Sequence, residues 1–260
     1  VAASLAALQM GSAWAQNAQT QDGLKLDEIV VTATPEARSK MKQSLSVSSI
    51  DAEQISNSGA TTSAEILRSI PGIRSEAGAE NNSNVTVRGV PISAGGARYV
   101  QFQEDGLPVL LWGDFNFVTP DMLLRADLGT DGVEVVRGGS ASTMATNSPA
   151  GVINFISKTG ETEQKSVAVT TNVGGANQKR YEFAYGKPTG TDSTFFLSGF
   201  IRDGEGPRET HGVNVEGGGQ LRAVFTKDLG QGNNIKIFTK FLNDKTPISM
   251  PVPVNIVNGQ

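Results

Sequence analysis

The sequence lacks several residues and patterns on which whole classes of protein depend. It has no cysteine and one histidine, which excludes disulfides, thiolate metal sites and clustered-histidine sites. No apolar run reaches the roughly 18 residues of a membrane-spanning helix. The 22 basic and 26 acidic side chains give a net charge of −4, so no basic footprint indicates binding of nucleic acid. Only 6% of the residues are aromatic, whereas 30 glycines among short alternating segments favour β structure.

The motifs of enzymes and metal sites are also missing. His211 lies in a polar segment without a cysteine or an organised serine motif, which is typical of a surface loop. The run Gly138-Gly139-Ser140 lacks the Lys-Ser/Thr end of a phosphate-binding loop. The acidic residues around His211 do not have the spacing of a calcium loop. We therefore expect a protein that is not an enzyme, with no catalytic residue, no metal and no cofactor.

Residues 1–15 have the apolar character of a secretory signal peptide and end in an A-x-A cleavage site at Ala13-Trp14-Ala15. The alternative is a buried apolar helix. The polar residues that follow favour the signal peptide, because they suit a cleavage site better than the end of a core helix. Since the sequence starts without Met and without a charged segment, we interpret residues 1–15 as the remnant of a signal peptide.

A polar linker over residues 16–35 contains a short run of β-branched residues at 27–33. The run reads DEIVVTA and stops shortly before Pro35, which cannot donate a hydrogen bond to a β-ladder. No hairpin partner lies nearby in the sequence. Two readings stay open at this point: strand addition to another protein, or an edge strand of the domain that follows.

Residues 36–160 have the pattern of a compact α+β domain. Short strands are expected at 45–50, 84–90, 99–103, 109–111, 133–137 and 152–157. The capping box of Thr62 and Glu65 predicts a helix that stops at the Pro-Gly pair 71–72. A second helix is expected to start at residue 119, with Gly129 as its cap, and the Asp-Gly pair at 105–106 predicts a hairpin turn.

Residues 161–260 change to segments of roughly ten residues that alternate apolar and polar side chains. Five such segments follow one another, separated by Gly, Asn and Asp. In the second segment Tyr181 and Phe183 share one face, while Arg180 and Glu182 share the other. This period is typical of transmembrane β-barrel strands, and a soluble antiparallel sheet is the alternative.

Six motifs follow one another along the sequence: DEIVVTA (27–33), SAEILRSIPGI (63–73), VTVRG (85–89), EDGLPV (104–109), GVEVVRG (132–138) and SPAGVINFISK (148–158). In this order they resemble the TonB-dependent outer-membrane receptors. The first resembles the TonB box, the next four resemble elements of the plug domain that fills the receptor barrel, and the last resembles the plug's final strand. One departure marks a divergent branch, because the Gly-Pro and aromatic-Gly pairs usual after the second Arg-Gly are missing. A second departure, too few residues before the box for a signalling domain, argues against a signal-transducing role.

The resemblance implies an α+β plug domain at 36–160, followed at 161–260 by the first antiparallel strands of a transmembrane β-barrel. The complete family barrel has about 22 strands. Five strands cannot close it, so we expect an N-terminal fragment of a larger protein. The implied location is the bacterial outer membrane, with barrel lipid outside, the plug inside the barrel and the box facing the periplasm. The implied activity is uptake of an oligosaccharide or a ferric siderophore, driven through TonB by the inner-membrane proton gradient.

The resemblance also implies three sets of site residues. The TonB-binding set is Asp27, Glu28, Ile29, Val30, Val31, Thr32 and Ala33. The set that would latch the plug to barrel glutamates beyond residue 260 is Arg88, Glu134 and Arg137. The substrate-binding set, on outward plug loops 78–83, 92–98 and 112–117, is Asn81, Asn82, Ser83, Arg98, Trp112, Asp114 and Phe115.

A second hypothesis from another class remains: an exported plug-like module that binds a ligand or TonB without transport. It predicts a sheet with soluble faces after residue 160. The apolar face of Ile235, Ile237 and Phe241 opposite Lys236 and Lys240 favours a lipid-facing surface instead. Within the transporter hypothesis, a shortage of arginine in the outward loops slightly favours a neutral oligosaccharide over an anionic ferric chelate.

Overall fold

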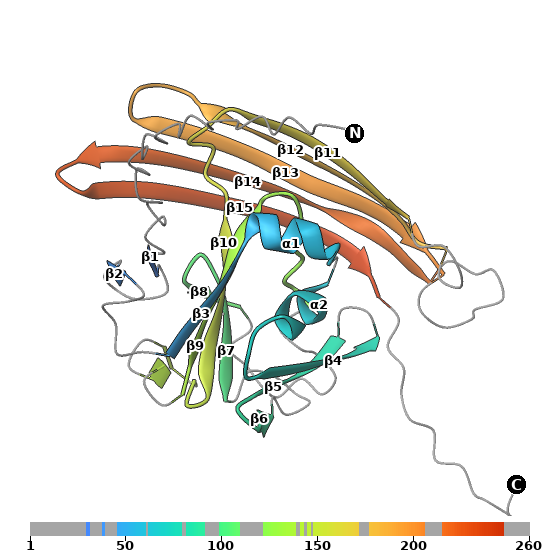
Figure 1. Ribbon diagram of the computed structural model, residues 1–260. Helices are drawn as coiled ribbons and strands as arrows, with labels where there is room; N and C mark the ends of the chain where they lie inside the picture. Colours follow the sequence, from blue (N-terminus) through green and yellow to red (C-terminus); the bar gives the residue numbers. More distant parts are fainter. Residues whose placement is uncertain are drawn as a thin grey trace, which may run out of the picture.

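The computed structural model describes residues 30–31, 38–39, 46–60, 62–79, 82–91, 99–109, 122–138, 141–142, 145–146, 148–171, 177–205 and 215–246. The predicted signal remnant at 1–15 lies outside the described residues. The described part has two bodies: an α+β domain, the predicted plug, and a long curved antiparallel sheet that arches over it (Figure 1). We call this curved sheet the wall.

The plug contains one mixed sheet and one small antiparallel sheet. The mixed sheet has the order β3-β9-β10-β7-β8, in which only the β10–β7 pair is parallel. Its strands are β3 (Ser46–Asp51), β7 (Val100–Glu104), β8 (Leu107–Pro108), β9 (Thr130–Arg137) and β10 (Gly151–Ser157). The small sheet is β4 (Ile73–Ala79), β5 (Asn82–Val87) and β6 (Val90–Pro91), and β1 (Val30–Val31) pairs with β2 (Arg38–Ser39).

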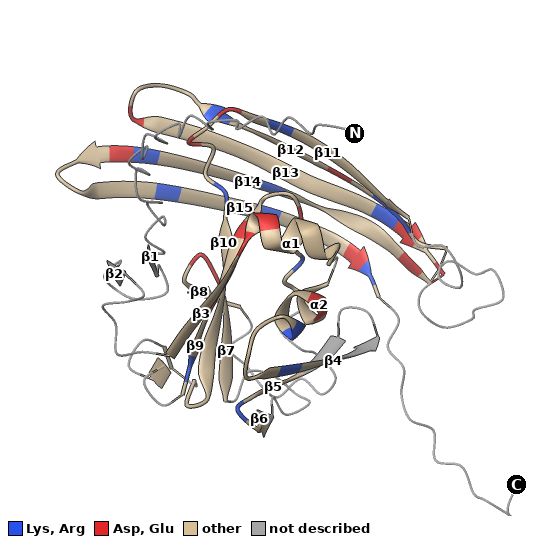
Figure 2. Cartoon of the chain, viewed as in Figure 1, with Lys and Arg blue, Asp and Glu red and all other residues tan. Residues whose placement is uncertain are grey.

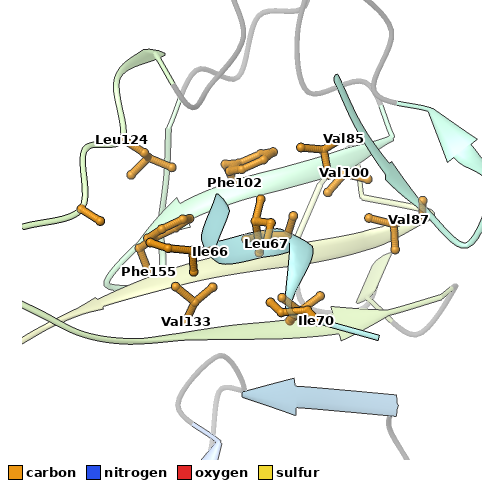
Figure 3. Packing of buried hydrophobic residues seen from close by; sticks show 14 residues of the cluster. Ile66, Leu67, Ile70, Val85, Val87, Val100, Phe102, Leu124, Val133 and Phe155 are labelled. Carbon is orange, nitrogen blue, oxygen red and sulfur yellow. The ribbon is translucent and has the colours of Figure 1, made fainter. Parts of the chain in front are cut away.

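Two short helices cover the plug sheets, and both begin with a capping box. The box of Thr62 and Glu65 starts α2 (Ser63–Arg68), as the sequence predicts. Asp51 and Gln54 form a second box at α1 (Ala52–Ser58), which ends at Gly59 in the left-handed conformation. The buried face of α2 packs with strand residues in the plug core shown in Figure 3, including Ile66, Leu67, Ile70, Phe102, Val133 and Phe155.

Residues 105–106 form the predicted tight turn, with positive φ at both Asp105 and Gly106, between β7 and β8. The predicted helix from residue 119 to Gly129 is wrong over its described part. Residues 124–127 have no regular structure, and Gly129 lies in a turn without the positive φ of a helix cap. The structure also adds α1 and β4, which the sequence patterns did not predict.

The wall is a meander of five strands, each paired antiparallel with the next. They are β11 (Gln164–Thr171), β12 (Lys179–Pro188), β13 (Ser193–Gly204), β14 (Glu216–Gly230) and β15 (Asn233–Lys245). Short turns at residues 189–192 and 231–232 join strands at one end, and the longer connection at 205–215 lies at the other. This unclosed sheet beside an α+β domain confirms the predicted fold class.

The two faces of the wall differ as the alternation predicts. Large apolar side chains on the face turned away from the plug are exposed, for example Val167 at 80% and Phe241 at 67%. The face toward the plug, the inner face, buries polar side chains, among them Arg180, Ser198 and Arg222. Among the described residues, no helix is long and apolar enough to span a membrane.

Leu67→Ala is expected to destabilise the plug by about 2–5 kcal/mol, because Leu67 is fully buried in the core and its truncation leaves a cavity. Leu107→Ala is the matched control. Leu107 is 64% exposed, so its truncation should change stability by no more than about 0.5 kcal/mol. Urea titration of the purified receptor, with limited proteolysis as the readout of unfolding, measures the loss of stability in both variants. Equal losses at the two positions would contradict the core assigned to α2.

Candidate functional site

The plug meets the inner face of the wall through an irregular segment at residues 124–129, which we call the strap. The strap has neither helix nor strand, and it is almost completely buried. Residues 127–130 form a turn in which the Thr130 N–H donates to the Asp127 carbonyl at 2.8 Å. The strap therefore buries backbone groups that no secondary structure satisfies, and each of these groups needs another partner.

Wall side chains supply many of these partners. The Arg125 carbonyl accepts from Gln220 Nε2 at 3.2 Å and from Arg222 Nη2 at 3.1 Å. The Ala126 carbonyl accepts from Arg180 Nη2 at 2.5 Å. The Leu128 N–H donates to a Glu182 carboxylate oxygen at 3.0 Å. Side chains of β12 and β14 thus satisfy the strap backbone in place of the hydrogen bonds of a helix.

Asp127 is the polar centre of the strap. One of its carboxylate oxygens accepts from the Gly129 N–H at 2.8 Å, and the other accepts from Gln220 Nε2 at 2.8 Å. Ser198 Oγ lies within 3.3 Å of both oxygens, and Arg222 Nη1 lies at 3.9 Å. A side chain at Gly129 would collide with Ser198 Oγ, so glycine permits this close approach of strap and wall.

A buried charge cluster holds the strap where β15 ends. Arg125 Nε donates to Asp244 at 2.9 Å, and the other oxygen of Asp244 accepts from Arg202 Nε at 2.8 Å. Arg202 Nη1 also bonds Glu216 at 2.9 Å. All four side chains are at most 3% exposed, so each charge depends on its partners. Figure 2 shows acidic and basic positions together at this end of the wall.

A second charged contact holds the β7–β8 turn against β14 and β15. Glu104 pairs with Lys240 and, at 3.3 Å, with Arg222. Asp105 pairs with Lys236 at 2.8 Å. Arg180 and Arg222 therefore bond strap carbonyls, and Arg222 together with the lysines of β15 bonds the carboxylates of the turn.

The predicted latch residues lie at the opposite end of the plug sheet. Arg137 is the last residue of β9, and Arg88 follows β5. Arg137 bonds the Pro71 carbonyl and, at 2.8 Å, Ser48 Oγ, whereas Arg88 bonds Ser46 Oγ at 2.9 Å. Burial and the neighbouring Arg88 charge lower the pKa of the Arg137 guanidinium. Within the described ranges neither arginine forms an ion pair. Glu134 is buried in β9, three residues nearer the wall.

The predicted TonB-binding residues are only partly described. Val30 and Val31 form β1 and pair with Ser39 and Arg38 of β2. The other five, Asp27, Glu28, Ile29, Thr32 and Ala33, lie outside the described residues. The box segment thus contains extended backbone that already has one partner strand in its own chain.

The predicted substrate residues are mostly not described either. Asn82 and Ser83 belong to β5, where they pair with Ala79 and Ala77 of β4. The predicted loop at 78–83 is therefore shorter than expected, because the strands leave only two residues between them. The predicted substrate residues outside the described ranges are Asn81, Arg98, Trp112, Asp114 and Phe115.

A polar cleft of about 400 Å³ separates α1 from the inner face of β11 and β12. Ser56 and Asn57 line it from the helix, and Ser166, Ala168 and Thr170 line it from β11. Lys158 lies in the cleft, where burial lowers the pKa of its ammonium group and the charges of Asp131 and Asp127 partly offset that effect. Within the described chain, no hydrogen bond joins α1 to β11.

Sequence reasoning missed the strap and its wall partners. The strand alternation placed Arg180, Glu182 and Arg222 on the polar face, yet it carried no information on what they bind. The missing signal was the pairing register, which places Ser198 directly opposite Arg222 and Arg222 opposite Lys240. With that register, the row of polar side chains would have indicated which wall positions bond the plug.

Comparison with known proteins gives relatives for both bodies. Residues 39–152 match the TonB-dependent Receptor Plug Domain family. The vitamin B12 transporter BtuB of Vibrio vulnificus (strain CMCP6) is 27% identical over 207 residues, which cover 78% of this chain and 30% of that protein. The chain therefore spans about a third of the length of this relative.

Solved receptors share the fold at low identity. The siderophore receptor PirA from Pseudomonas aeruginosa is 20% identical with a TM-score of 0.53, over 77% of this chain and 36% of that one. The ferripyoverdine receptor of the Pseudomonas aeruginosa outer membrane is 17% identical with a TM-score of 0.60, over 81% of this chain and 27% of that one. The alcaligin receptor FauA from Bordetella pertussis is 22% identical with a TM-score of 0.57, over 77% of this chain and 32% of that one.

These matched proteins are transporters and receptors rather than enzymes, in agreement with the sequence prediction. The family match falls on the α+β domain, and the structural matches extend into the wall. The chain thus contains a TonB-dependent receptor plug domain at residues 39–152, followed by antiparallel strands that resemble the start of the receptor barrel.

Proposed function

We propose that this protein is an outer-membrane receptor that takes up a scarce nutrient, with energy delivered by TonB. The observation that supports this most is the two-faced wall: its outer face exposes apolar side chains, and its inner face is bonded to the plug. An apolar outside suits lipid, and a polar inside suits a plugged lumen. A receptor of this kind blocks the outer membrane until the plug is rearranged.

The alternative is an exported plug-like module that binds without transport. Such a module needs a water-compatible outer sheet face. The outer face instead exposes a band of apolar side chains across successive strands: Val167, Phe183, Leu221 and Phe241 lie in one row, with Gly199 between Phe183 and Leu221. This row favours the membrane receptor over the soluble module.

The proposed TonB site is the box at residues 27–33. Its β1 segment already pairs with β2 through Val30 and Val31. A TonB strand would therefore either replace β2 or add to the other edge of β1, and main-chain hydrogen bonds would hold it in both cases. Competition with β2 provides a way to keep the box closed until it is needed.

The proposed substrate is one of three nutrient classes. The sequence suggested an oligosaccharide or a ferric siderophore, and a relative is named as a vitamin B12 transporter, whereas the solved neighbours are named as siderophore receptors. Growth of strains with and without this receptor is compared in three media: iron-chelated medium, cyanocobalamin-limited medium, and medium with a glycan as sole carbon source. The medium in which growth requires the receptor identifies the nutrient class. Growth that never depends on the receptor, or does so without TonB, would contradict active uptake.

The plug–barrel latch is proposed to use Arg88 and Arg137, supported by Glu134. The two guanidinium groups lie close together at the end of the plug sheet away from the strap, and their repulsion contributes to the lowered pKa of Arg137. Two like charges without a paired carboxylate among the described residues are expected to attract glutamates from the remaining barrel. Arginine suits this role because its planar fork can hold a carboxylate with two hydrogen bonds.

Ile29→Pro is expected to abolish uptake while leaving surface binding of the nutrient intact, because proline removes a backbone donor that strand addition requires. Ile29→Val keeps the donor and the β-branched side chain and serves as the control. Radiolabelled nutrient bound to cells at low temperature and accumulated at growth temperature separates the two steps. Normal accumulation by the proline variant would remove the TonB-box assignment.

Arg137→Lys is expected to weaken the plug by about 1–2 kcal/mol, because an ammonium group cannot span both Pro71 O and Ser48 Oγ as the guanidinium does. The urea midpoint of plug unfolding in the purified receptor measures the loss. Arg68→Lys is the control, since within the described residues Arg68 bonds one group, the Ser75 carbonyl, at 3.2 Å. Equal small effects at the two sites would argue against the two-bond role of Arg137 within the plug.

A further inference from the structure

The plug contacts the wall very differently on its two sides. From β12 to β15 the strap and the β7–β8 turn are joined to the wall by buried hydrogen bonds and ion pairs, such as Gln220–Asp127, Arg125–Asp244 and Lys236–Asp105. Between α1 and β11 lies the polar cleft, which strap residues such as Leu128 also line together with Glu182. Within the described chain no hydrogen bond joins α1 to β11 across it. The cleft is therefore the side on which plug and wall can separate without breaking ion pairs.

The lining of the cleft carries polar groups on both sides, beside apolar side chains such as Ile55 and Ala168. The helix contributes Glu53, Ser56 and Asn57, and β11 contributes Gln164 and Ser166, among other residues. Hydroxyl, amide and carboxylate groups of this kind exchange hydrogen bonds with water and with a hydrated solute at little cost. The apolar side chains of β11 that alternate with them, such as Val167, face the other side of the wall.

The topology makes α1 the easiest part of the plug to move. α1 follows β3 directly, and β3 is an edge strand that pairs with β9 alone. None of the residues of α1 is fully buried, and its core contact is made by the partly buried Ile55, so displacement of the helix exposes little apolar surface. β3 is also the first strand of the plug sheet after the box and β2, so a pull on the box reaches β3 and α1 before any other part of that sheet.

We propose that the cleft between α1 and strands β11–β12 is the route along which the nutrient passes the plug. The route takes a hydrophilic solute that forms hydrogen bonds, and it opens when α1 and β3 move away from the wall while the strap stays bonded to β12–β15. The present volume of about 400 Å³ lies at the low end of the roughly 300–1,000 Å³ of ligand pockets, so a large solute requires that movement. This inference rests on the proposed function, because a protein without transport has no route.

The absence of cysteine allows the cleft to be filled at chosen positions. Ala168→Cys on β11 and Ser56→Cys on α1 each place one thiol in the cleft. The full-length receptor, in the outer membrane of cells, is treated with fluorescein maleimide, which is bulky, or with N-ethylmaleimide, which is small. Uptake is followed with radiocobalt-labelled cyanocobalamin, radioiron-labelled ferric siderophore or radiolabelled glycan, as the growth experiment selects, and gel fluorescence measures the extent of labelling.

Fluorescein at either cleft position is expected to lower uptake at least about tenfold, with surface binding of the nutrient unchanged and a smaller effect from N-ethylmaleimide. Thr191→Cys is the matched control: it lies on the same wall in the exposed β12–β13 turn, outside the cleft, and its labelled form should transport normally.

Full uptake by fluorescein-labelled Ala168→Cys and Ser56→Cys would overturn the route. A parallel loss of binding and uptake would also overturn it, because the adduct would then act on nutrient binding. The proposed function fails separately if the unlabelled receptor shows no TonB-dependent uptake, and in that case the route falls with it.

Discussion

The structure depends on how the backbone of the strap is satisfied inside the protein. An irregular segment buried against a sheet carries N–H and C=O groups that cost about 1–3 kcal/mol each when left without partners. Here Arg180, Glu182, Gln220 and Arg222 supply those partners from two strands of the wall. The wall side chains thus make the hydrogen bonds to the strap backbone that a helix or a β-ladder would otherwise make. The position of the plug follows, because the bonds form in one register of strap against wall.

The need to bond the strap backbone explains why the two faces of the wall differ in polarity. Its inner positions must bond a polar segment, and its outer positions expose apolar side chains across the width of the sheet. Strict alternation along a strand produces both faces from one sequence. The inner face is not uniformly polar, because Phe196 and Val224 pack with Ala184 in a small buried cluster against Leu128 of the strap. Apolar packing therefore adds to the polar bonds at the centre of the contact.

The sequence predicted those parts that local chemistry determines. The capping box at Thr62, the Asp105-Gly106 turn and the alternation of the wall each depend on residues within a few positions of one another, and all three are present. The helix ending at Gly129 failed because its residues bond to side chains that lie about 50 to 100 positions later in the chain. Pro120 and a suitably placed glycine are helix signals, but they are weaker than a set of long-range hydrogen bonds to a buried backbone. The ion pairs of Glu104 and Asp105 were missed for the same reason, since the partner lysines lie more than 130 positions away.

The polar nature of the plug–wall contact also bears on how such a plug can work. A purely apolar contact would be stable in many relative positions, and its strength would grow with area alone. A contact made of paired charges penalises displacement steeply, because separation of Arg125 from Asp244 breaks a buried ion pair, and breaking such a pair costs about 3–5 kcal/mol. Such a contact holds one side of the plug firmly. Movement is then directed to the side where α1 faces β11 across polar groups that water can solvate at once. The division between a bonded side and a solvated side, rather than the overall strength of the contact, determines which part of the plug can yield.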